Sequence, residues 1–268
     1  MPHYICTNCG TQYAETVQPP EECTICIEER EFVAWEGQKW TTSDQLAKSH
    51  RNVFCQEEKG LSGIGMEPSF AIGQRGLLIT HPEGNVLWDC ISLLDDSLVE
   101  MLNGIGGLSA IAISHPHYYS CMMEWAETFD CPVFLHHADR KWVMRSGPAI
   151  EYWEGDRKNI GAGLTLIRCG GHFDGGTVLH WPAGAGGKGV LLSGDIIHVV
   201  QDRRWVSFMY SYPNLIPLSA SKVRQIVNCV EPFEFDRIYG AWWGKTVSSN
   251  AKAAVDRSAR RYIQHLQE

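Results

Sequence analysis

The sequence is poor in basic residues and has no long apolar run. It has 268 residues, with 23 Lys and Arg against 31 Asp and Glu, and a formal net charge of −8. Binding to nucleic-acid phosphates needs a basic face, so this composition argues against nucleic acid as a partner. No stretch of 18 apolar residues is present, so we predict no membrane span. We see no charged-then-apolar leader and therefore expect a cytoplasmic protein.

Ten cysteines are present, and four of them fall within the first 26 residues. Cys6 and Cys9 form one Cys-x-x-Cys pair, and Cys23 and Cys26 form the second. Each pair makes a tight turn that directs two thiolates at one centre, and two such turns complete a tetrahedral site. Disulfides are disfavoured without an export signal, and a redox pair is disfavoured without a βαβ context. We predict a structural zinc, with iron as the chemical alternative.

This N-terminal segment is strongly acidic. Arg30 is the single Lys or Arg in residues 1–36, which contain seven Glu. Phosphate would be repelled, so we interpret the zinc ribbon as a module for packing or for partner binding. Thr42 and Gln45 have capping-box spacing and predict a short helix after the ribbon. We predict a ribbon and linker over 1–50 and a main domain over 51–268.

The main domain has the pattern of a mixed α/β (α+β) protein. Residues 60–69 are rich in glycine and predict a loop. Short apolar segments that predict strands lie at 70–73, 76–80, 85–90, 111–114, 132–135, 164–169, 177–181, 189–193 and 235–239. Helical spacing occurs at 94–103, 121–129 and 249–267. Strands that first pair with strands and then alternate with helices indicate two sheets between helices.

Two histidines, His115 and His117, follow the strand at 111–114. Residues i and i+2 at a strand end leave on the same side, so both imidazoles can reach one point. Imidazole is the commonest ligand of zinc, and a hydrolytic site needs about three protein ligands plus an open position. The pair alone also fits two ordinary loop histidines, so the rest of the chain must decide.

Four motifs together resemble those of the metallo-β-lactamase-fold hydrolases. They are Asp89 after an apolar strand, the segment His115–Ser120, a histidine in the glycine-rich turn Gly170–Thr177, and the aspartate that closes Leu191–Asp195. The likeness covers most of residues 65–268. It implies an αββα sandwich with a metal site at one sheet edge.

The resemblance also implies the ligands of one metal. In the family, the two histidines of the second motif and the later histidine hold the first metal, and the aspartate of the fourth motif bridges two metals. We therefore predict a main-domain metal held by His115, His117, His172 and Asp195. Zinc, iron and manganese all accept such ligands.

The positions of the second metal's ligands carry Tyr119, Ser120 and Trp243 instead. A phenol with a pKa of about 10, a hydroxyl and an indole cannot hold a hard divalent cation tightly at neutral pH. We predict at most one main-domain metal. The proton-handling role of the motif's aspartate would pass to Tyr119 or a nearby histidine, with Tyr119 donating to a developing oxyanion. His136 or His137 could replace a lost ligand.

The segment 199–220 combines aromatic residues with Arg203 and Arg204. Over the metal edge it would form an aromatic pocket with a guanidinium for an anionic group, and Trp243 would make that pocket drier. The alternative is an insertion that packs against the ribbon or a second copy of the chain. The sequence therefore leaves open whether the protein forms a homo-oligomer.

Three functional hypotheses follow. The first is a mononuclear metal-dependent hydrolase of an ester, thioester, lactone or similar small substrate, because the three histidines remain. The second is a catalytically inactive binding or scaffold protein, because the second-metal positions are lost. The third is an iron protein with redox chemistry, in which the four-thiolate centre relays electrons.

Overall fold

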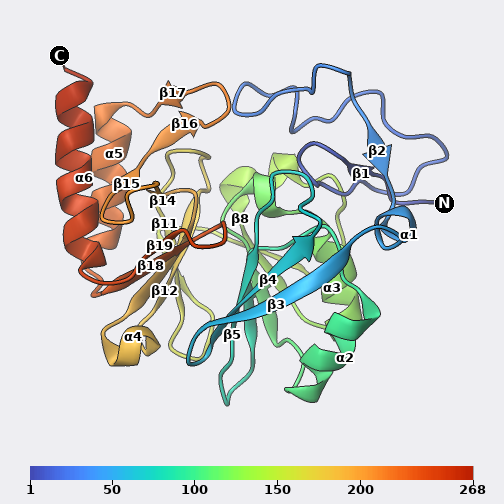
Figure 1. Ribbon diagram of the computed structural model, residues 1–268, viewed down its shortest axis with the longest axis horizontal. Coiled ribbons are helices and arrows are strands. Elements are labelled where there is room, and N and C mark those ends of the chain that lie inside the picture. The colour runs from blue at the N-terminus through green and yellow to red at the C-terminus, as the bar shows by residue number, and fades with distance from the viewer. Residues whose placement is uncertain (268) are drawn as a thin grey trace.

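Two β-sheets pack face to face and carry helices on their outer sides (Figure 1). The computed structural model describes residues 1–267. The first sheet has seven strands in sequence order: β3 (Arg51–Glu58), β4 (Leu61–Glu67), β5 (Gly76–Ile79), β6 (Val86–Trp88), β7 (Ala110–Ala112), β8 (Val133–His136) and β9 (Ile150–Trp153). The second has six, in the order β10 (Arg157–Asn159), β11 (Thr165–Arg168), β12 (Thr177–Trp181), β13 (Val190–Gly194), β18 (Arg237–Gly240) and β19 (Thr246–Val247).

The core has three layers of apolar contacts. Leu77 and Trp88 of the first sheet meet Leu179 and Leu192 of the second in the central layer. One outer layer joins the first sheet to α2 (Asp96–Gly104) and α3 (Met122–Phe129). The other joins the second sheet to α5 (Ala220–Val230) and α6 (Ala251–His265). The predicted αββα sandwich is therefore confirmed.

The strand directions bring the motifs to one edge of the sandwich. β6, β7 and β8 run parallel, so the residues that follow these strands lie at the same end of the first sheet. Asp89 follows β6, and His115 follows β7. Asp195 follows β13 of the facing sheet.

Most of the glycine-rich residues 60–69 form strand β4 (Leu61–Glu67), so the predicted loop is wrong. β4 pairs with both β3 and β5. A side-chain carbon on Gly63 would lie 2.6 Å from the ring of Trp243, and one on Gly65 would lie 2.8 Å from it. The glycines are thus needed for the close approach of the indole to the strand, not for a turn.

Segment 70–73 is a turn in which the Gly73 amide donates to the Phe70 carbonyl, so the strand predicted there is also wrong. The other predicted strands and the three long helices are present, with ends that shift by at most two residues. The segment 199–220 contains short strands paired in twos: β14 (His198–Val199) with β15 (Val206–Ser207), and β16 (Met209–Ser211) with β17 (Ile216–Pro217). Remaining elements are α1 (Ser43–Leu46), α4 (Gly184–Gly187) and the 3₁₀ turns η1 (Pro116–Tyr118) and η2 (His137–Trp142).

The N-terminal module packs on the main domain. β1 (Ile5–Cys6) pairs with β2 (Trp40–Thr41), and Thr42 caps α1 as the spacing predicts. The backbone amide of Gln12 donates to the Ser120 carbonyl, and the Ser92 hydroxyl donates to the Gly10 carbonyl. No helix among residues 1–267 is long and apolar enough to cross a membrane.

We predict that Gly63→Ala destabilises the protein by about 1–3 kcal/mol, because the added methyl overpacks the indole of Trp243. The measurement is the free energy of unfolding in urea. Gly104→Ala, where no atom lies within 4 Å of the new methyl, serves as the control. Equal effects of both substitutions would contradict the packing argument.

Candidate metal centres

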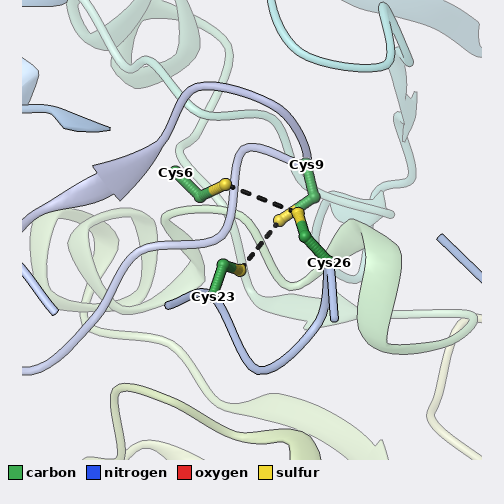
Figure 2. A group of neighbouring side chains, drawn as sticks. All are labelled: Cys6, Cys9, Cys23 and Cys26. Atoms are coloured by element: carbon green, nitrogen blue, oxygen red, sulfur yellow. Dashed lines mark hydrogen bonds between the residues drawn. The ribbon is translucent and has the colours of Figure 1, made fainter. Parts of the chain in front are cut away.

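The four N-terminal cysteines converge on one point (Figure 2). The sulfur atoms of Cys6 and Cys26 are 3.6 Å apart, as are those of Cys9 and Cys23, and all four side chains are buried. Hydrogen bonds among the four thiols lower the pKa of Cys6 and Cys23 and raise that of Cys9 and Cys26, so two of the four sulfurs favour the thiolate that a metal binds. The arrangement fits the predicted zinc ribbon.

The loops of the second centre are fixed by backbone hydrogen bonds. Asp89 accepts from the Ser114 amide at 2.7 Å, just before His115. Asp139 accepts from the Gly175 amide at 2.9 Å and so anchors the turn that carries His172. Gly194 has φ of +53°, and a side-chain carbon there would lie 2.8 Å from the Ser114 hydroxyl. These contacts align the ends of β7 and β13.

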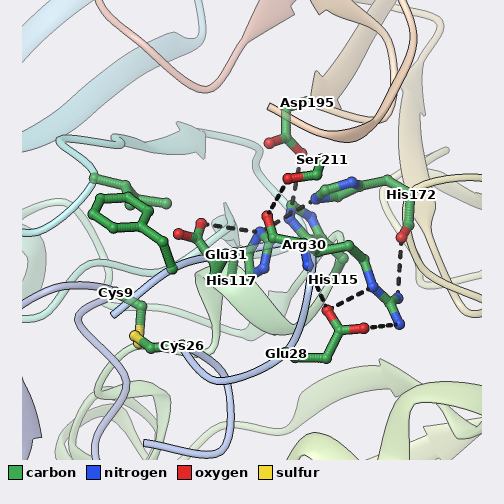
Figure 3. Close-up of polar contacts among 12 residues, drawn as sticks. Cys9, Cys26, Glu28, Arg30, Glu31, His115, His117, His172, Asp195 and Ser211 are labelled. Atoms are coloured by element: carbon green, nitrogen blue, oxygen red, sulfur yellow. Dashed lines mark hydrogen bonds and ion pairs between the residues drawn. The ribbon is translucent and has the colours of Figure 1, made fainter. Parts of the chain in front are cut away.

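All four predicted ligands of the main domain come together (Figure 3). One potential ligand atom from each of His115, His117, His172 and Asp195 lies within 4.8 Å of the others. His115 Nε2 is 3.2 Å from Asp195 Oδ1, and His172 Nε2 is 3.2 Å from His117 Nδ1. Atoms bound to one tetrahedral zinc at ~2.0–2.1 Å lie about 3.3 Å apart, so these spacings suit a shared cation.

Several buried polar atoms here have no hydrogen-bond partner among the described residues: His115 Nε2, His117 Nε2, Asp195 Oδ1 and Glu31 Oε2. An unsatisfied buried polar atom costs about 1–3 kcal/mol, and more when it is charged. A cation between the imidazoles and the carboxylates would satisfy the acceptor atoms that face it. The residues present therefore fit a metal.

Burial also keeps the imidazoles neutral, which is the state that binds metals. It lowers the pKa of His115 and of His117 well below the ordinary value and lowers that of His172 to about 4. His172 Nδ1, which points away from the other donors, lies 2.7 Å from the Tyr210 carbonyl. His115 Nδ1 lies 2.9 Å from the Ser114 hydroxyl. Such contacts orient ligand histidines in metal sites.

The positions of the second metal's ligands are used for packing. The Ser120 hydroxyl donates to the Cys90 carbonyl and accepts from the Gln74 side-chain amide. Trp243 covers Gly63, with the Arg75 guanidinium 5.1 Å from its ring centre. The third, Tyr119, is 2% exposed and belongs to the core cluster with α3.

Tyr118, not Tyr119, is the tyrosine beside His115, with their ring centres 4.5 Å apart. Its hydroxyl is buried near Asp195, and burial followed by the charge of Asp195 raises its pKa. The reason is the 3₁₀ turn η1, in which residues three apart share a face. If the chain had continued as a strand, alternate residues would share a face, and Tyr119 would lie on the side of His115 and His117.

The two arginines of segment 199–220 make other contacts. Arg204 forms an exposed ion pair with Asp202, and Arg203 donates to the Gly244 carbonyl. Their predicted role in substrate binding stays a prediction. His136 lies 3.1 Å from the Gly155 carbonyl, and His137 pairs with Glu154 at the surface, so neither joins the four donors.

Glu31 of the N-terminal module lies next to this centre, which no pattern in the sequence predicted. Its Oε1 atom lies 3.8 Å from His117 Nδ1, and its side chain is buried. Arg30 beside it donates to the His172 carbonyl and lies over the ring of Phe173. Only the position of Glu31 five residues after Cys26 could have hinted at this role.

Comparison with known proteins finds a relative by sequence and solved structures with a similar fold. "Uncharacterized protein YmaE" of Bacillus subtilis (strain 168) is 52% identical over 268 residues, which is 99% of this chain and 97% of that protein. No protein-family model matches the chain.

The similar solved structures include metallo-β-lactamases. TMB-1 has a TM-score of 0.62 at 13% identity and covers 81% of this chain and 99% of its own. The metallo-β-lactamase DIM-1 has a TM-score of 0.60 at 14% identity, and the match covers 80% of this chain and 98% of DIM-1. SMB-1, also a metallo-β-lactamase, has a TM-score of 0.53 at 14% identity, covering 81% and 95%. These likenesses show the fold, and the predicted resemblance is confirmed at that level.

We expect Cys23→Ser to remove one equivalent of bound metal and to lower the unfolding temperature, because the ribbon loses one corner of its tetrahedral centre. Elemental analysis of the purified protein and a thermal scan measure both effects. Cys55→Ser, at an exposed cysteine of β3, is the matched control. An unchanged metal content in Cys23→Ser would refute the ribbon centre.

Proposed function

The chain belongs to the same protein family as YmaE of Bacillus subtilis, and from its metallo-β-lactamase fold we propose that it is a metal-dependent hydrolase with one metal ion in the main domain. The observation that carries this proposal is the convergence of three neutral imidazoles and one carboxylate at the sheet edge where the fold's motifs meet. Zinc is the leading candidate, and iron and manganese remain alternatives.

A single metal is favoured by the contacts of the second-metal positions. Ser120 is tied to Cys90 and Gln74, Tyr119 is in the core, and Trp243 lies on β4. A cation held by the four donors would supply Lewis-acid activation of water and of a carbonyl group. We therefore propose an ester, thioester, lactone or similar small molecule as the substrate class.

The chain's own groups would orient and stabilise the reacting atoms. The Tyr118 hydroxyl, buried near Asp195, is the group we propose to donate a hydrogen bond to a developing oxyanion, in place of Tyr119. Tyr212 donates to the Asp195 carbonyl at 2.6 Å and so holds the loop that carries the carboxylate.

A second candidate is a binding or scaffold protein that keeps the metal for stability. The burial of the four donors favours it, because a substrate needs access to a catalytic metal: each of their residues is 3% exposed or less. A protein that holds a full complement of metal but hydrolyses no ester, thioester or lactone would support this candidate over the hydrolase.

We predict that His117→Ala removes one metal equivalent, leaves the ribbon's metal in place and reduces hydrolysis to the uncatalysed background. The physical reason is the loss of one of three imidazoles that hold the main-domain metal. Elemental analysis and a panel of chromogenic esters, thioesters and lactones measure both effects.

His137→Ala removes an exposed imidazole outside the group and should change neither quantity. If His117→Ala kept both the metal content and the activity of the wild type, the hydrolase proposal would be wrong.

A further inference from the structure

We propose that Glu31 is a fifth ligand of the main-domain metal, supplied by the acidic arm, residues 28–31, that follows the second cysteine pair. This inference rests on the metal site proposed above and adds a ligand from outside the metallo-β-lactamase-like domain. The centre would then consist of three imidazoles and two carboxylates.

The carboxylate of Glu31 lies next to a ligand histidine. Glu31 Oε1 is 3.8 Å from His117 Nδ1, the same nitrogen that lies 3.2 Å from His172 Nε2 (Figure 3). Its other oxygen is buried without a hydrogen-bond partner among the described residues. A buried carboxylate oxygen with no donor, on a side chain whose other oxygen faces His117, has the chemistry of a metal ligand. Glu31 lies just outside the group of four donors whose ligand atoms are within 4.8 Å of one another, so as a ligand its carboxylate would move toward them.

The negative charge of the buried carboxylates also supports a cation at this place. Glu31 is 7% exposed and Asp195 is 3% exposed, so two carboxylates are buried at this centre. The guanidinium of Arg30, the residue before Glu31, is engaged with both oxygens of Glu28 and with the His172 carbonyl. A divalent cation would neutralise the two carboxylates and leave a centre with no net charge.

Hydrogen bonds from the main domain fix the acidic arm in this position. The Asn214 side-chain amide donates to the carbonyls of both Glu29 and Glu31 at 3.0 Å. The Ser211 hydroxyl donates to the Arg30 carbonyl at 3.1 Å. Both partners lie in the segment 199–220, so this insertion positions the arm over the centre.

A consequence follows for the hydrolase. A catalytic metal keeps one position open for water or substrate, whereas Glu31 takes up a position at this metal. Substrate would have to displace the Glu31 carboxylate, and the N-terminal module would thereby control access to the metal.

The experiment uses the full-length protein with zinc in the ribbon and Co²⁺ titrated into the main-domain site. The Co²⁺ dissociation constant, from competition with a chelator, and the visible d–d absorption report the ligand set without any activity assay. Glu31→Gln keeps the shape and removes the charge. Glu29→Gln is the matched control, because Glu29 is exposed and its carboxylate accepts from Tyr210 on the same arm.

We expect Glu31→Gln to weaken Co²⁺ binding by more than about tenfold, since even groups outside the ligand shell change metal affinity by about 10–100-fold. Its d–d absorption should change, and Glu29→Gln should match the wild type in both readouts. Glu31→Asp keeps the charge and should lose less affinity than Glu31→Gln. Retention of the ribbon's zinc checks folding.

Wild-type affinity and absorption in Glu31→Gln would overturn the inference, as would an equal loss in Glu29→Gln. Either result leaves the metal site of the proposed function intact. If the wild type bound no Co²⁺ beyond the ribbon, or if His117→Ala bound it equally well, the metal site itself would be refuted, and Glu31 as its ligand with it.

Discussion

The structure depends on one constraint: buried ligand atoms need a partner. His115 Nε2, Asp195 Oδ1 and Glu31 Oε2 are all buried and have no hydrogen-bond partner among the described residues, and they belong to three separate parts of the chain. Buried polar groups are normally satisfied, so such a concentration marks a binding site for a cation. The parallel strands β6 and β7, and β13 of the facing sheet, end where these atoms meet.

The N-terminal module packs against this centre and is not a separate attachment. Its first half contacts the main domain through Gly10 and Gln12, and its second half extends over the metal group through Arg30 and Glu31. The cysteine cluster fixes the turn from which the arm starts. At its other end the arm is held by Asn214 and Ser211 of the main domain. The arm therefore links the two centres along the chain.

Much of the fold and of the site was predictable, because the relevant patterns are local. The Cys-x-x-Cys pairs and the His-x-His pair fix ligand types within a few residues of each other, and the strands that precede His115 and Asp195 are continuous apolar runs. Strand β4 was missed because its glycines serve a contact with Trp243, which is about 180 residues away. Tyr118 was missed because η1 is a 3₁₀ turn. Glu31 was missed because only the tertiary fold brings it to His117.

The central claim is that His115, His117, His172 and Asp195 hold one cation. Anomalous diffraction from crystals of metal-replete protein, collected on both sides of the metal's absorption edge, tests it most directly. The account predicts one peak among the four cysteines and one peak among the three imidazoles, within bonding distance of Asp195. A single peak at the cysteines, or two peaks in the main domain, would contradict it.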